Sequence, residues 1–202
     1  FWSTSNCAVL VDDTKNSDAD SRRQQAAANL AARFNCTFVP VPEGTLPAEV
    51  LALMQELGIK DIRFVGKQVS LDARQKLAGF RLQEITGSDD NVEDEVEDEI
   101  TNSTRRPKLV IVAAPDWRAA IAIGAHPNGN SVVRQLTDAS QVPDVVTFIQ
   151  QHNITDVRVV GIPSLADQIA EQLAAAGINV TKISGSKASE ISAEVLKRVK
   201  AE

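Results

Sequence analysis

The sequence predicts an α/β protein of two similar units, each a mostly parallel four-stranded sheet flanked by helices. The first observation is an internal repeat: residues 49–66 and 144–161 are identical at seven of eighteen aligned positions, where random pairing gives about one. The second is that each copy places apolar residues at helical spacing, then a β-branched run ended by a glycine. A helix followed at once by an apolar strand is half of a βαβ crossover, which favours parallel sheets covered by helices.

The duplication includes polar as well as apolar positions. The identical pairs are Val50/Val145, Gln55/Gln150, Ile59/Ile154, Asp61/Asp156, Arg63/Arg158, Val65/Val160 and Gly66/Gly161. Outside this stretch, EITGS at 84–88 is matched by KISGS at 182–186. The polar run 101–106 followed by Pro107 therefore marks the boundary between a first unit at 1–106 and a second at 107–202.

In the first unit, apolar runs alternate with amphipathic stretches. The apolar runs predict strands at 8–11, 36–41, 61–65 and 81–85. Helical spacing predicts an alanine-rich helix at 24–34 and further helices at 46–57 and near 69–78. The polar residues between the first strand and the first helix predict a turn.

The second unit repeats this order. Strands are expected at 109–113, 132–136, 157–160 and 179–183. Helices are expected from Pro115-Asp116-Trp117 to about residue 124, and at 143–152, 165–176 and 188–200.

An acidic run closes the first unit. Eight of the 27 acidic residues lie within 89–99, and the remaining 19 are balanced by 21 basic residues. Val92, Val96 and Ile100 recur every four residues through the run, which predicts an amphipathic helix with an acidic, solvated outer face. A calcium site is the alternative, but the glycine-punctuated loop of a calcium hand is missing.

Composition and motifs argue against several classes of protein. Aromatic residues make up 4% of the chain and tyrosine is absent, which disfavours the aromatic platforms on which sugars or nucleic-acid bases stack. No apolar run is long enough to span a membrane. The sequence contains no GxxxxGK[ST], GxGxxG, HExxH or GxSxG motif, and His126 and His152 lie far from either cysteine. We therefore expect no catalytic site, metal or cofactor.

Candidate ligand-binding residues lie at the carboxyl ends of strands, where open parallel sheets bind ligands. In the first unit they are Asp12, Asp13 and Gly66, and in the second Asp116, Trp117 and Gly161. For Asp12 and Asp116 the favoured alternative is capping of the following helix, which needs only a short oxygen-bearing side chain.

The two cysteines indicate an oxidising compartment. Cys7 and Cys36 begin the first two predicted strands, so neighbouring strands would bring them within disulfide distance. The second unit has Lys108 or Leu109 and Ser131 at the matching places, so a bridge would be an addition to the core. Four Asn-x-Ser/Thr sequons also favour an extracellular location as glycosylation candidates: Asn35, Asn102, Asn153 and Asn179.

The chain begins Phe1-Trp2-Ser3, without an initiator methionine. This fits either a trimmed expression product or a mature protein whose signal peptide has been removed. Two large aromatic side chains on a free terminus would expose on the order of 300 Å² of mostly apolar surface. We expect Phe1 and Trp2 to be buried, either against their own unit or against a neighbouring subunit.

Five stretches share one order of strands, helices and glycines across both units. They are TLPAEVLALMQELGIKDIRFVG (45–66), LAGFRLQEITGS (77–88), VIVAAPDWRAAIA (110–122), QLTDASQVPDVVTFI (135–149) and AAAGINVTKISGS (174–186). In this order they resemble the cell wall binding repeat type 2 family, in two tandem, divergent copies that cover nearly the whole chain. The resemblance implies a surface-attached, non-enzymatic module that holds a protein to an envelope polymer, with the repeats packed around a pseudo-symmetry axis.

The chain departs from the family pattern in three respects. The paired glycine after the third strand is Gly66-Lys67 here and Gly161-Ile162 in the second unit. The polar, tyrosine-bearing stretch after the fourth strand is replaced by residues 89–91 and 187–189. The family usually has three copies, whereas this chain has two.

We therefore expect an extracellular, cell-surface protein that is not an enzyme and binds envelope glycan through loops at strand carboxyl ends. The alternative is a self-assembling subunit of a surface filament or surface layer, a homo-oligomer whose repeat faces contact further copies of the chain. An enzyme acting on a small ligand is a distant third possibility, because a doubly wound fold alone does not imply a function.

Overall fold

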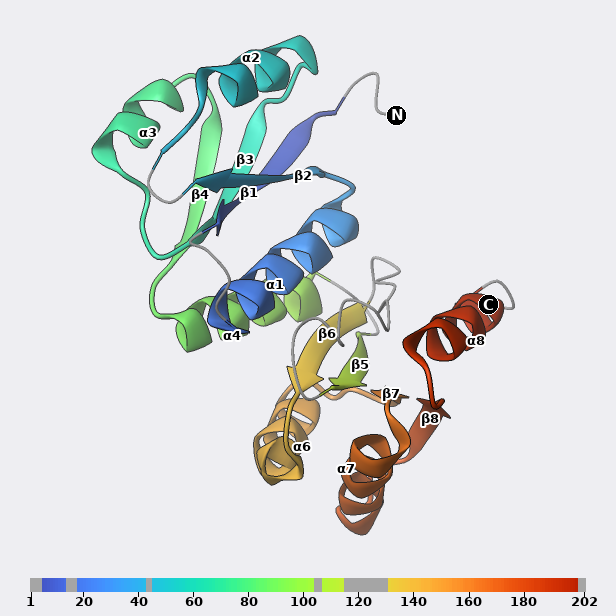
Figure 1. Cartoon of the computed structure of the whole chain (residues 1–202). Helices are drawn as coiled ribbons and strands as arrows, with labels where there is room; N and C mark the ends of the chain where they lie inside the picture. Colours follow the sequence, from blue (N-terminus) through green and yellow to red (C-terminus); the bar gives the residue numbers. More distant parts are fainter. Residues whose placement is uncertain (1–4, 14–17, 43–44, 104–106, 115–130, 200–202) are drawn as a thin grey trace. The chain divides into compact units, whose positions relative to one another are not determined.

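The structure, a computed structural model of the chain, describes residues 5–13, 18–42, 45–103, 107–114 and 131–199. It contains two four-stranded sheets in which all neighbouring strands are parallel. Helices flank each sheet (Figure 1). The predicted fold class, two similar α/β units, is confirmed.

The first sheet has the strand order β2-β1-β3-β4. Its elements are β1 (Cys7–Asp13), α1 (Asp18–Phe34), β2 (Thr37–Pro42), α2 (Ala48–Glu56), β3 (Asp61–Gly66), α3 (Leu71–Lys76), β4 (Arg81–Thr86) and α4 (Asp89–Asn102). The order reverses between β1 and β3, so the carboxyl ends of these two strands form the switch point of the sheet.

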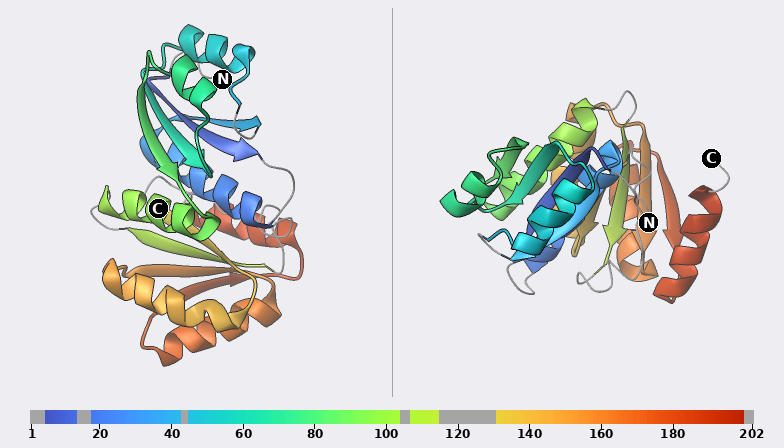
Figure 2. Two further views of the ribbon diagram at one scale, coloured as in Figure 1. Left: turned by 90° about the vertical axis from the view of Figure 1, so that its left-hand side faces the viewer. Right: turned by 90° about the horizontal axis from the view of Figure 1, so that it is seen from above.

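Each face of the first sheet packs against its own pair of helices (Figure 2). Leu10, Ile62 and Phe64 face α2 and α3 and share a core with Met54 and Leu77. Because side chains alternate along a strand, the neighbouring positions point to the opposite face, which α1 and α4 cover (Figures 1 and 2).

The second sheet repeats this arrangement in the order β6-β5-β7-β8. Its elements are β5 (Lys108–Ala113), β6 (Ser131–Leu136), the 3-10 turn η1 (Ala139–Gln141), α6 (Val142–Gln151), β7 (Asp156–Gly161), α7 (Pro163–Ala175), β8 (Val180–Ser184) and α8 (Ala188–Val199). The helix predicted between β5 and β6 lies outside the described residues. Contacts between residues divide the chain into Phe1–Glu99 and Ile100–Glu202, a division that falls within α4.

The first helix is longer than predicted, since α1 begins at Asp18 rather than at residue 24. The polar residues before residue 24 were expected to form a turn. Acidic residues such as Asp18 and Asp20 favour a helix amino terminus, because the macrodipole is positive there. Residues 18–23 of the polar stretch therefore form the first turns of the helix.

The acidic run forms the predicted amphipathic helix, α4. Val92, Val96 and Ile100 are all buried. Its acidic face is less solvated than expected, because Glu97 is only 2% exposed and Glu93 pairs with Arg22 of α1 at 3.4 Å.

Cys7 and Cys36 form a disulfide, as predicted, with their Cα atoms 4.8 Å apart. The reason is the register of the edge pair: Ala8 lies opposite Thr37, which brings the preceding residues together. In the second unit, Lys108 and Ser131 occupy the same register positions.

The glycine that ends the third strand of each unit is required by close packing. A Cβ on Gly161 would overlap the carbonyl oxygen of Ala113 and lie 2.7 Å from its Cβ. A Cβ on Gly66 would overlap the carboxylate of Asp12 and lie 2.8 Å from the Phe64 ring. The repeated glycine therefore reflects how closely the central strands approach.

Replacing Cys7 and Cys36 by serine is expected to destabilise the first unit by about 2–4 kcal/mol, because the bridge joins residues 29 apart and restricts the unfolded chain. Hydrogen exchange of the β1 and β2 amides measures the loss, and the β5 and β6 amides serve as an internal control. Unchanged protection in β1 and β2 would contradict the prediction.

Gly161→Ala is expected to cost about 1–3 kcal/mol or more, because the overlapping atom belongs to the backbone of the paired strand. Gly79→Ala is the matched control, since a Cβ there meets nothing within 4 Å. Thermal unfolding of both variants tests this, and equal melting temperatures would show that β5 and β7 can separate without cost.

Candidate functional site

Asp12 lies at the switch point of the first sheet, but it is fully buried. Its Oδ2 accepts a hydrogen bond from the backbone N–H of Lys67 at 2.8 Å. The carboxylate therefore fixes the start of the loop after β3 and fills the space beside Gly66. Helix α1 is described from Asp18 onward, and capping by Asp12 stays a prediction.

The second unit makes the same turn without a carboxylate. The register places Ala113 opposite Gly161, and the Ala113 carbonyl oxygen accepts a hydrogen bond from Ile162 at 3.4 Å. The backbone oxygen of Ala113 therefore accepts the hydrogen bond that corresponds to the one accepted by the Asp12 carboxylate in the first unit.

The other candidates at strand carboxyl ends are only partly placed. Asp13 is the last residue of β1, and Gly66 and Gly161 are buried. Asp116 and Trp117 lie outside the described residues, as do Phe1 and Trp2. Ligand binding by the candidate residues stays a prediction.

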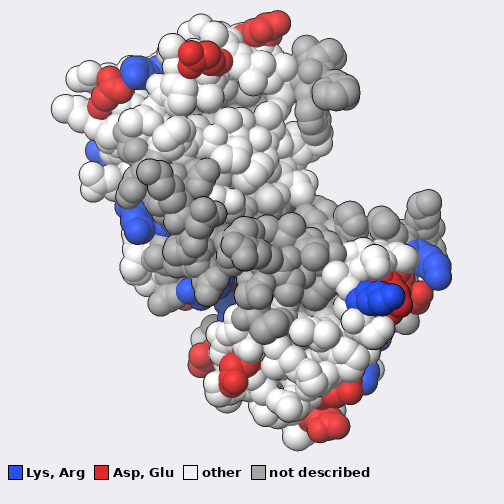
Figure 3. Space-filling view, in the orientation of Figure 1, with Lys and Arg blue, Asp and Glu red and all other residues white. Residues whose placement is uncertain are grey.

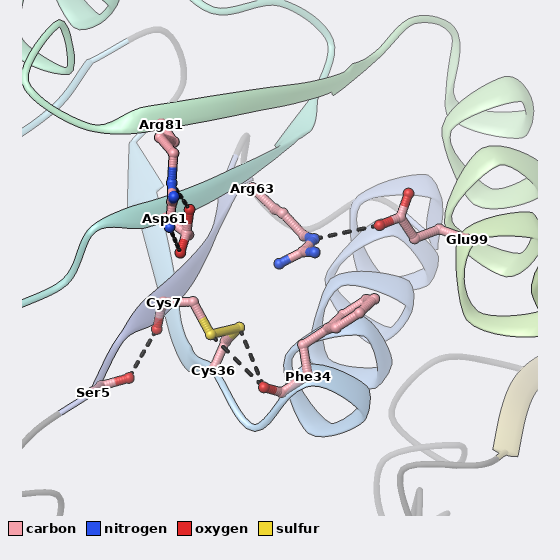
Figure 4. Close-up of a disulfide and its surroundings, with 8 residues drawn as sticks. All are labelled: Ser5, Cys7, Phe34, Cys36, Asp61, Arg63, Arg81 and Glu99. Atoms are coloured by element: carbon pink, nitrogen blue, oxygen red, sulfur yellow. Dashed lines mark hydrogen bonds and ion pairs between the residues drawn. A yellow bond between two sulfur atoms is a disulfide. The ribbon is translucent and has the colours of Figure 1, made fainter. Parts of the chain in front are cut away.

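A cavity of about 470 Å³ lies instead at the amino ends of β3 and β4. We call it the amino-edge groove; the residues that line it include Cys7, Phe34, Asp61, Arg63, Arg81 and Gln83. Figure 4 draws all of these residues except Gln83, with the disulfide at one side and the helices α1 and α4 beyond Arg63. Because α1 ends at Phe34, this part of the sheet face is left to polar side chains.

The β3–β4 register sets the polar side chains of the groove side by side. Asp61 lies opposite Arg81, and Arg63 lies opposite Gln83. Arg81 forms a bidentate pair with Asp61, in which Nη2 donates to Oδ2 at 2.7 Å. Such fork-shaped pairs are the geometrically specific form of the arginine–carboxylate interaction.

Phe34 and Glu99 hold the side chains of Arg63 and Gln83 in place. The Arg63 guanidinium carbon lies 3.9 Å from the centroid of the Phe34 ring, a cation–π contact. Its Nε donates to Glu99 of α4 at 3.4 Å, and Gln83 donates to the same carboxylate at 2.9 Å. The acidic helix therefore orients two residues of the groove.

The matching positions of the second unit carry a different pairing. Lys108 stands where the first unit has Cys7, and its Nζ lies 3.2 Å from Asp156. Arg158 lies 3.3 Å from the same carboxylate. Burial raises the pKa of Asp156, but hydrogen bonds from Arg158 and Lys108 outweigh it, and the net pKa is lowered.

Sequence reasoning did not identify the groove, although one signal was present. Asp61 and Arg63 are identical in the two copies, as Asp156 and Arg158, and stand two apart in otherwise apolar strands. Charges at alternate positions of a strand mark a face that a helix does not fully cover. Phe34, Arg81 and Gln83 have no comparable signal, because only folding brings them together.

The four sequon asparagines are all exposed. They follow or end helices that lead into the next strand, so they lie at the amino edges of the sheets. Asn35 and Asn153 have positive φ values of 54° and 52°, and Asn153 aligns with Gly58 at a helix carboxyl end, where asparagine is favoured without any glycan. Glycosylation stays a prediction.

Among the residues that the structure describes, no group of three or more His, Cys, Asp or Glu side chains could hold a metal ion. No helix in this part of the chain has both the length and the apolarity needed to cross a membrane. On the face drawn in Figure 3, the charged side chains are dispersed rather than gathered into a patch of one sign.

Comparison with known proteins supports the fold. No protein-family model and no curated protein matches the sequence. Among solved structures, Cwp6 from Clostridium difficile aligns with a TM-score of 0.76 and 15% identity, over 98% of this chain and 32% of that chain. A sugar transporter from Clostridium phytofermentans (13% identity, 96% and 92% coverage) and the regulator CcpA of Lactococcus lactis (9%, 97% and 91%) reach TM-scores of only 0.29 and 0.31.

The chain is thus an α/β protein of two units with the fold of part of a clostridial cell wall protein. It spans about a third of the length of Cwp6.

We expect the pairing with Arg81 to change the acid titration of the Asp61 carboxyl group. The hydrogen bonds that Arg81 donates to the Asp61 carboxylate hold the pKa of Asp61 below its ordinary value and raise the pKa of Arg81. Because the folded-state pKa is lowered, the stabilisation is complete above the ordinary carboxyl pKa and is lost as pH falls through the folded value.

Arg81→Ala is expected to raise the pKa of Asp61 toward its ordinary value in an NMR titration of the carboxyl carbon. Arg74→Ala, which breaks a separate exposed pair with Glu84, is the matched control and should leave Asp61 unchanged. An Asp61 titration that does not respond to Arg81→Ala would show that the pair does not form in solution.

Proposed function

We propose that this chain is a non-enzymatic, extracellular cell-surface protein whose two cell-wall-binding-type repeats attach it to an envelope polymer. The observation that carries the proposal is the match to the fold of Cwp6, a cell wall protein, over 98% of the chain. Membership of the cell wall binding repeat type 2 family is part of the proposal, supported by the stretches that both units share with that pattern.

Two further features support a location outside the cytosol. The Cys7–Cys36 bridge is of a kind that persists in oxidising compartments. The four sequon asparagines are exposed at the amino edges of the sheets, where attached sugars would not disturb either core.

The character of the groove supports binding rather than catalysis. Arg81 pairs with Asp61 inside the groove, and Arg63 and Gln83 donate to Glu99 of α4. The sulfur atom of Cys7, which lines the groove, is joined to Cys36 in the disulfide. Nucleophilic catalysis requires an activated nucleophile beside a base, whereas side chains in this groove are arranged as donors and acceptors.

Self-assembly into a surface layer or filament is the second candidate. It is favoured by two large apolar side chains of the first unit, Leu53 of α2 and Leu71 of α3, which are 45% and 72% exposed. The position equivalent to Leu53 in the second unit is Phe148, which is only 7% exposed. A second copy of the chain would cover Leu53 and Leu71.

The protein is expected to pellet with insoluble polymer purified from the envelope of the producing cells, and to stay in solution without it. Sedimentation at increasing polymer concentration measures the binding, with cellulose as the control solid. Protein that stays in the supernatant at every polymer concentration would contradict attachment. Protein that pellets without polymer, and is large by light scattering, would establish self-assembly instead.

A further inference from the structure

We propose that the amino-edge groove, where Arg81, Asp61, Arg63 and Gln83 lie side by side beneath the end of α1, binds an acidic sugar unit of the envelope polymer. The inference rests on the proposed function, because it names the site and the ligand chemistry of that attachment. It moves the site from the carboxyl ends of the strands to the amino ends of β3 and β4.

The side chains of the groove suit a ligand with adjacent oxygens. Guanidinium, carboxylate and amide groups are planar, and each offers two or more hydrogen-bonding atoms. A guanidinium has five N–H donors, of which Asp61 engages two on Arg81, through Nε and Nη2. The remaining donors suit a second carboxylate, because the Arg81 side chain is 78% exposed.

The groove is already ordered before a ligand arrives. Arg81 is held by Asp61, and Arg63 is held between the Phe34 ring and Glu99. Gln83 is held by the same glutamate. Side chains fixed in this way lose little conformational entropy on binding, so more of the interaction energy contributes to affinity.

The exposed arginine and the size of the groove favour an anionic ligand of sugar dimensions. The charged residues that line the groove are two arginines and one aspartate. Glu99 pairs with Arg63 from outside the lining, whereas the Arg81 side chain stays largely exposed beside Asp61. The volume of about 470 Å³ lies within the range of small-molecule sites, about 300–1,000 Å³. A uronic acid residue combines a carboxylate for Arg81 with hydroxyl groups for Asp61 and Gln83.

The second unit does not repeat this site. Lys108 replaces Cys7 and pairs with Asp156. Arg158 forms an ion pair with the same carboxylate. Asn179, the residue before β8, stands where the first unit has Arg81. Arg158 is equivalent in the repeat to Arg63 but lies in these different surroundings, so its replacement is the control for the changes made in the groove.

The experiment is an NMR titration of the ¹⁵N-labelled chain with α-1,4-trigalacturonate, with maltotriose as the uncharged control. Trigalacturonate is expected to shift the amides of residues 61–63 and 81–83 saturably, and maltotriose to leave them in place. Arg81→Ala and Gln83→Ala should each weaken trigalacturonate binding, the former by about tenfold or more, because a hydrogen bond to a charged group is lost. Arg158→Ala should bind as the unaltered chain does.

Three results would overturn the inference: shifts confined to residues outside the groove, equal affinity of Arg81→Ala, or equal binding of maltotriose. Sedimentation with the envelope polymer separates this inference from the proposed function. If the unaltered chain and Arg81→Ala pellet equally well, attachment stands and the groove is not its site. If neither pellets but trigalacturonate still titrates the groove, attachment fails and the acidic-sugar site stands.

Discussion

The close approach of two central strands at their carboxyl ends constrains each unit. Gly66 faces the Asp12 carboxylate and Gly161 faces the Ala113 backbone, and a Cβ at either glycine would overlap its neighbour. In the first unit the buried carboxylate also holds the backbone of Lys67. At this point an open parallel sheet ordinarily leaves a crevice for a ligand, and here the Asp12 side chain lies against Gly66.

At the amino end of the first sheet, by contrast, a groove lined partly by polar side chains lies beside β3 and β4. Helix α1 ends at Phe34, so polar side chains occupy the face of β3 and β4 that it leaves uncovered. Glu99 of the acidic helix orients Arg63 and Gln83. The acidic run therefore does more than present a solvated face, since it orients two residues that line the groove.

The two units share a scaffold and differ at the ends of their strands. Apolar positions recur because each sheet must be buried on both faces. Residue types at strand ends differ between the units: Cys7 corresponds to Lys108, and Asp12 corresponds to Ala113, although both of the latter pair are buried. These exchanges produce a disulfide and a groove in one unit and a three-membered ion cluster in the other.

The sequence by itself determined the fold class, the duplication, nearly all of the described elements and the Cys7–Cys36 pairing. These depend on local periodicity and on the register of neighbouring strands, which a pattern of residues records. It misplaced the start of α1, because a polar stretch can form either a turn or a solvated helix end. Only the tertiary structure brought Phe34, Asp61, Arg81 and Glu99 of four different elements together in and beside one groove, because contacts between residues distant in the chain leave no periodic signal.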